Sequence, residues 1–158
     1  MRRISTGMPL AAGVVVILTG AAVWHRPGGV TASRIEDAVA PTFANLIHLQ
    51  RSILGLPSVA ASTLRASAQC HKVGTAKETR GAGDWTCTVT WVTPGQRTPL
   101  RDTYDLSVAV DGCYTATADG AEAHLGGPTL TTQDGTTIVN LLYTFDGCFD
   151  VTGPFALP

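Results

Sequence analysis

Four cysteines are the residues whose type and spacing say most about the chemistry of this chain. They stand at Cys70, Cys87, Cys113 and Cys148. A structural zinc site uses closely spaced pairs such as C-x-x-C, and the sequence holds no such pair. In an oxidising compartment, four cysteines in a small domain are typical of two disulfide bonds. We therefore expect these residues to form disulfides and to bind no metal.

The pairing of the cysteines is predicted from the segments that carry them. Cys70 and Cys87 both stand on the apolar face of an alternating segment, and a hairpin through Gly81–Gly83 would place them opposite each other. Cys113 and Cys148 then pair by elimination, although four cysteines allow three arrangements. Each of these two follows an Asp-Gly pair, which predicts a tight turn or a bulge. A strained bridge there is the alternative that would permit thiol exchange.

Histidine is the other side chain suited to catalysis, and the chain has four: His25, His48, His71 and His124. A catalytic histidine needs a nucleophile or a metal and an orienting partner, and the sequence shows no grouping of that kind. The motifs G-x-S-x-G and H-E-x-x-H and the nucleotide-binding loops are also missing from it. We therefore expect surface histidines, no catalytic residue and no cofactor.

The clearest strand in the sequence begins at Trp85 and ends at Trp91. Thr86, Thr88 and Thr90 take one face of it, where their hydroxyls would form a regular ladder that suits a sugar or a peptide backbone. Threonine is also simply a good strand former. The two tryptophans share the opposite face with apolar neighbours, which favours the core, but if exposed they would stack on glycan rings. These five residues are the candidate binding surface.

A single amphipathic helix is expected to begin at a capping box formed by Ser33 and Glu36. Pro41 inside it predicts a kink on the exposed side, or two short helices with Thr42 capping the second. Gly55 predicts the end. The predicted buried stripe consists of Ile35, Val39, Phe43, Leu46, Ile47, Gln50, Ile53 and Leu54.

Two further alternating segments, residues 104–110 and 139–145, predict additional strands. One amphipathic helix cannot bury its stripe alone, and a sheet with one apolar face needs a cover. The sequence therefore predicts an α+β domain over residues 32–158, in which the helix packs on four or five antiparallel strands and two disulfides staple the fold.

An uncharged apolar run at residues 8–24 predicts a transmembrane helix. At about 1.5 Å per residue it reaches about 25 Å, near the lower limit for crossing a bilayer core of about 30 Å. Two arginines in front of it predict that residues 1–7 are cytoplasmic and that the rest of the chain is outside. Cleavage of a secretory signal before Val23 is the alternative. Residues 25–31 form a short linker that would keep the domain close to the membrane.

The charge of the chain argues against nucleic acid as a partner. Eleven basic residues against twelve acidic ones give a formal net charge of -1, whereas nucleic-acid binders carry a strongly basic face. Because the linker is short, the expected partners are the membrane itself, through residues 8–24, and another membrane or envelope protein. The first functional hypothesis is a non-catalytic binding or accessory module, and the alternatives are a thiol-exchange protein or other enzyme, and a secreted binding protein.

The order of segments also resembles a group of known proteins. An N-terminal membrane segment precedes FANLIHLQRSILG, GAGDWTCTVTW, YDLSVAVDGCYTA and LYTFDGCFD. This order resembles small membrane-anchored exported proteins of actinobacteria, and a helix followed by antiparallel strands is similar to cystatin-like ectodomains. The resemblance implies an exported, disulfide-bonded domain and no catalytic residue.

Overall fold

The computed structural model of the chain describes residues 29–74, 79–120 and 122–151. The predicted transmembrane segment, residues 8–24, lies outside the described residues. The elements are α1 (Ala32–Ile53), the 3₁₀ helix η1 (Ala61–Leu64), β1 (Ser67–Lys72), β2 (Gly83–Trp91), β3 (Leu100–Val108), β4 (Cys113–Ala118), α2 (Glu122–Leu125), β5 (Thr129–Thr131), β6 (Thr137–Val139) and β7 (Thr144–Cys148).

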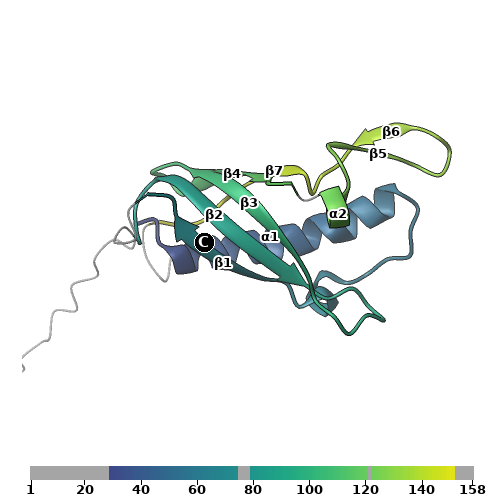
Figure 1. The fold of residues 1–158 in the computed structure, drawn as a ribbon, viewed down its shortest axis with the longest axis horizontal. Helices are drawn as coiled ribbons and strands as arrows, with labels where there is room; N and C mark the ends of the chain where they lie inside the picture. Colours follow the sequence, from purple (N-terminus) through teal and green to yellow (C-terminus); the bar gives the residue numbers. More distant parts are fainter. Residues whose placement is uncertain (1–28, 75–78, 121, 152–158) are drawn as a thin grey trace, which may run out of the picture.

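A five-stranded antiparallel sheet in the order β1-β2-β3-β4-β7 forms the body of the domain. α1 runs along one face of this sheet, and the separate hairpin of β5 and β6 projects away from the body (Figure 1). The predicted α+β fold, one amphipathic helix packed on an antiparallel sheet, is confirmed.

The first turn of α1 is capped differently from the prediction. Thr31, in extended conformation, is the N-cap, and its hydroxyl accepts the Arg34 N–H at 3.4 Å. Ser33 therefore lies inside the helix, and the predicted capping box of Ser33 and Glu36 is wrong. The Glu36 carboxylate instead accepts the Cys70 N–H of β1 at 2.8 Å.

α1 continues without interruption through Pro41, so the predicted division into two helices is wrong. Pro41 lies on the exposed side, where water can satisfy the carbonyl that its missing N–H leaves free. The end of the helix is as predicted, because Gly55 has a φ of 67° and the Leu56 N–H reaches back to the Arg51 carbonyl at 2.9 Å.

The core lies between α1 and the sheet. The predicted stripe is buried from Ile35 to Gln50 except for Leu46, which is partly buried, whereas Ile53 is exposed. Gln50 is a polar member of this core, and its side-chain oxygen accepts the Leu141 N–H at 2.7 Å. An aromatic cluster joins helix and sheet, with ring centroids 4.9 Å apart for Phe43 and Trp91.

The folded part begins before the expected boundary at residue 32. Val30 is buried in the core, and the Gly29 N–H donates to the Val151 carbonyl at 3.0 Å. The last three residues of the predicted linker therefore belong to the domain, which brings its folded part closer to the predicted membrane segment.

Both predicted disulfide bonds are present: Cys70–Cys87 and Cys113–Cys148. In each pair the cysteines lie directly opposite each other on neighbouring strands. Opposite residues in an antiparallel ladder alternate between hydrogen-bonded and non-hydrogen-bonded pairs. The Val73 N–H donates to the Asp84 carbonyl and the Phe149 N–H donates to the Gly112 carbonyl, and counting back along each ladder makes both cysteine pairs non-hydrogen-bonded. Cα atoms of opposite residues approach most closely there, at 4.1 and 3.9 Å in the two bridges.

The predicted strand at residues 139–145 is wrong, because a loop separates β6 from β7. Buried Asn140 holds that loop: its side-chain amide donates to the Leu125 and Gly127 carbonyls at 2.8 Å each. Val139, expected on the buried face of that strand, lies instead at the end of β6, outside the five-stranded sheet, and is exposed.

The predicted strand at residues 104–110 ends early. β3 stops at Val108, and Val110 lies exposed in the turn to β4.

Candidate functional site

The face of the sheet that points away from α1 is polar and rich in hydroxyls, and we call it the open face. The positions that face α1 alternate along β2, β3 and β4 and are mostly buried, and those of β1 are partly buried, so the remaining side chains point to the open face. No helix of the described residues lies over it (Figure 1). Its threonines on the three central strands are Thr86, Thr88, Thr90, Thr103, Thr115 and Thr117.

The five candidate binding residues of β2 fall on opposite faces. Thr86, Thr88 and Thr90 lie on the open face, half-buried between the neighbouring strands. Trp85 and Trp91 are only 1% and 3% exposed, on the core side. The favoured prediction that both indoles lie in the core is therefore confirmed, and their alternative role in a binding surface is corrected, because a buried ring cannot stack on a sugar. The threonine ladder is the part of the candidate surface that reaches solvent.

The two disulfides also lie on opposite faces. Cys87 is 0% exposed and its bridge to Cys70 lies under α1, whereas Cys148 is exposed and its bridge to Cys113 lies on the open face. A hollow of about 530 Å³ surrounds the outer bridge and includes Ser107 and Thr115. Cys148 thus makes the outer bridge accessible to a reagent in solution, whereas in the inner bridge Cys87 is buried and Cys70 is partly exposed.

Carboxylates accompany the hydroxyls at this end of the open face. Asp84 and Asp105 line a second hollow of about 410 Å³, which shares Ser107 and Thr115 with the first. Asp146 lines the first hollow, and its carboxylate accepts the Thr115 hydroxyl at 2.5 Å. Among the described residues none of these three carboxylates forms an ion pair. The two hollows therefore present negative charge to solvent.

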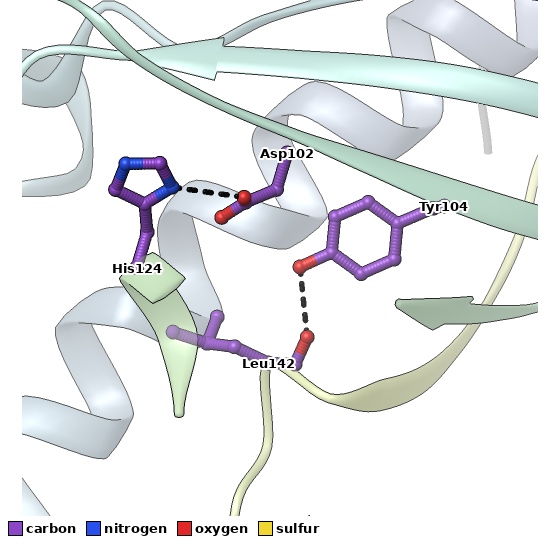
Figure 2. A network of polar contacts seen from close by, with 4 residues as sticks. All are labelled: Asp102, Tyr104, His124 and Leu142. Carbon is purple, nitrogen blue, oxygen red and sulfur yellow. Dashed lines mark hydrogen bonds and ion pairs between the residues drawn. The ribbon is translucent and has the colours of Figure 1, made fainter. Parts of the chain in front are cut away.

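A separate polar group lies on the core side of β3, at its contact with α2. Asp102 is 7% exposed, and one of its carboxylate oxygens lies 3.1 Å from Nδ1 of His124, which is 39% exposed (Figure 2). The other carboxylate oxygen of Asp102 is buried without a hydrogen-bond partner in the described part of the chain. Beside it, the Tyr104 hydroxyl donates to the Leu142 carbonyl at 2.8 Å.

Burial dominates the ionisation of this group. Desolvation raises the pKa of Asp102 against the opposing effect of His124. Desolvation, assisted by the charge of Asp102, also raises the pKa of Tyr104. When Asp102 accepts the proton of Nδ1, the imidazole presents Nε2 as a base or ligand. Within the described residues, however, no Ser, Thr or Cys side chain bonds to this imidazole, so the pair lacks the nucleophile of a hydrolytic triad.

The other predicted site features are distributed as follows. His48 bonds to the Val59 carbonyl through Nδ1 at 2.9 Å, His71 is exposed on the open face, and His25 lies outside the described residues. The described residues contain no cluster of histidine, cysteine or acidic side chains that would hold a metal ion. The same residues contain no helix that is long and apolar enough to cross a bilayer.

The pair of Asp102 and His124 was not identified from the sequence. Asp102 stands two residues before Tyr104, on the same face of β3 as Tyr104, Leu106 and Val108. Extending the alternation of that strand by one step would have placed a carboxylate in the core. A buried carboxylate implies a partner, but nothing in the sequence names His124 as that partner.

No protein-family model matches the chain, and neither a curated protein nor a solved structure matches it. The resemblance to small exported actinobacterial proteins therefore stays a prediction.

Proposed function

We propose that this chain is an extracytoplasmic binding or accessory domain of the cell envelope, tethered to the membrane by residues 8–24. Two disulfides support an oxidising compartment, because such bonds persist outside the cytoplasm. The folded part includes Gly29, which leaves a tether of a few residues and favours a partner in or near the same membrane.

The open face is the observation that carries a binding function. α1 covers one side of the sheet, and the other side keeps hydroxyls, two adjoining hollows and three carboxylates in contact with solvent; these carboxylates form no ion pair with another described residue. Side chains of this kind form hydrogen bonds to a partner's polar groups. They include no oriented nucleophile in the described residues, so binding is a better account of this face than catalysis.

Affinity capture of the full chain from native membranes in mild detergent tests this function. Thr88 lies opposite Thr103 on the open face, and the double variant Thr88→Lys/Thr103→Lys adds two positive charges to this acidic face without entering the core. Asn45→Lys, on the exposed side of α1, is the control. We expect the wild type and the control to retain an envelope protein that the double variant loses. Recovery of the chain alone, or equal recovery with all three proteins, would contradict the proposal.

Thiol–disulfide exchange is a second candidate, favoured by the exposure of Cys148 on the open face. An external protein thiolate would attack Sγ of Cys148, the bond to Cys113 would break, and Cys113 would leave as a thiolate while a mixed disulfide forms. Reduction with glutathione, alkylation and peptide mass mapping test this reaction. Labelling of Cys113 with Cys70–Cys87 intact supports exchange; two resistant bridges rule it out.

A further inference from the structure

β7 forms one edge of the five-stranded sheet. Among the described strands its one neighbour in the sheet is β4, in an antiparallel register that pairs Cys113 with Cys148 and Thr117 with Thr144. An edge strand presents a row of unpaired N–H and C=O groups, which is a template for an additional strand unless the protein covers it.

The alternation of hydrogen bonds defines which groups of β7 point outward. The Ala118 N–H donates to the Tyr143 carbonyl and the Phe149 N–H donates to the Gly112 carbonyl, so the odd-numbered residues of this segment bond to β4. The backbone groups of the even-numbered residues then point away from the sheet. Those residues are Thr144, Asp146 and Cys148.

The outward groups of β7 are not capped by the described residues. No hydrogen bond within that part of the chain reaches the backbone N–H or C=O groups of Thr144, Asp146 or Cys148. The opposite edge is treated differently, because the Glu36 carboxylate accepts the outward N–H of Cys70 on β1. At the β1 edge one outward donor is therefore occupied by a side chain from α1, whereas the β7 edge offers three donors and three acceptors.

The side chains at the β7 edge indicate what kind of strand fits it. The same three residues direct exposed side chains to the open face, beside the hollow of about 530 Å³. A strand added at this edge would place every second side chain on the open face next to Asp146. Asp105 and Asp84 extend the negative charge along the adjoining hollow.

Charge decides between a second copy of this chain and a different partner. Two β7 strands paired antiparallel about Asp146 would bring two carboxylates together, and like charges directly opposite each other destabilise a strand pair. A basic side chain at that position would instead meet the Asp146 carboxylate, which forms no ion pair with the other described residues. The partner that fits is therefore an extended segment with Lys or Arg at alternate positions.

We propose that the β7 edge binds an extended basic segment of another protein by strand addition. The segment pairs with the backbone of Thr144, Asp146 and Cys148 and directs its basic side chains to Asp146. This inference rests on the proposed binding function and names the chemistry of its partner.

Fluorescence anisotropy with a labelled peptide of alternating Lys and Thr tests the inference, using the full chain in detergent with both bridges intact. Two further peptides carry N-methyl groups, one on the lysine amides and the other on the threonine amides. Only one set of amides faces β7 in a given strand direction, so we expect one methylated peptide to lose binding and the other to retain it. Equal affinity of all three peptides, equal loss with both methylated ones, or failure of the unmodified peptide to bind would overturn the proposal.

Charge variants provide the second arm. Asp146→Asn leaves the backbone edge in place and removes the carboxylate, and we expect it to weaken binding about two- to fivefold, as for other exposed ion pairs. Asp37→Asn, on the exposed side of α1, is the matched control and should bind as the wild type does. Unchanged affinity of the Asp146 variant would overturn the assigned partner charge. If membrane capture recovers a partner while the peptides fail, the edge inference is wrong and the proposed function stands; if capture also fails, both are wrong.

Discussion

The two disulfides are expected to contribute to stability in different ways, and replacing them pairwise separates the contributions. The bridges join residues 17 and 35 positions apart in sequence. By the loop-entropy relation, removing them costs about 3 kcal/mol for Cys70–Cys87 and about 4 kcal/mol for Cys113–Cys148. Alanine replacements, which leave no polar group behind, should therefore rank the outer bridge first.

Serine replacements are expected to reverse this order. Cys87 is 0% exposed, so a serine hydroxyl there lacks access to water. An unsatisfied buried hydroxyl lowers the free energy of unfolding by about 1–3 kcal/mol more. Cys148 is exposed, so its serine is hydrated at little cost. The double serine variant of the inner pair should lose about 4–6 kcal/mol in total, against about 4 kcal/mol for the outer pair.

Urea unfolding of the four double variants and the wild type, followed by the fluorescence of the buried Trp85 and Trp91, measures these differences. The alanine variants control for loop entropy, and the serine variants differ from them only by two hydroxyls. If serine and alanine cost the same at the inner pair, the assignment of Cys87 to a water-free core is refuted. If the inner alanine variant costs more than the outer one, loop length does not decide the ranking.

Three further predictions concern single residues. The pKa of Asp102 is raised in the folded state, so the folded protein binds a proton there that the unfolded chain releases. The unfolding free energy of the wild type should therefore rise relative to that of Asp102→Asn as the pH falls from 7 through the raised pKa towards 3.8. Urea unfolding at a series of pH values measures both, and a constant difference between the two proteins would contradict this prediction. Gln50→Leu should destabilise by about 1–3 kcal/mol, measured by urea unfolding, because the Leu141 N–H loses its acceptor. Gly147→Ala should cost about 1–3 kcal/mol in thermal unfolding, because its Cβ would lie 2.4 Å from the Tyr114 hydroxyl oxygen, while Gly127→Ala, with open space around it, should be nearly neutral.

The sequence predicted those features that depend on local alternation. The period of two in β2 identified the buried face and, with it, the partner of Cys87. It failed where a distant contact decides the local structure. The same Asp-Gly pair forms a turn before Cys113, where Gly112 has a φ of 86°, but lies inside β7 before Cys148, where Gly147 makes room for a tyrosine ring.

Glu36 on α1 is a second case in which a distant contact decides the local structure. The spacing of Ser33 and Glu36 is correct for a capping box, yet the carboxylate of Glu36 binds a backbone N–H that is 34 residues away in sequence. No local pattern distinguishes these two uses of one side chain. Likewise, the partner of buried Asp102 comes from α2, 22 residues further along the chain. The candidate site was therefore only partly predictable, through its threonines and its cysteines.

The position of the outer disulfide also connects stability with the proposed binding edge. β7 has five residues and, in the part of the chain that the structure describes, one neighbouring strand, so backbone pairing alone gives it little protection against fraying. The Cys113–Cys148 bridge fastens its last residue covalently to β4. A strand that must keep outward N–H and C=O groups free for a partner cannot be held by a second neighbour, and a bridge on the open face holds it without covering that edge. The inner bridge joins β1 to β2 on the side of the sheet that α1 covers, so it plays no part at the β7 edge.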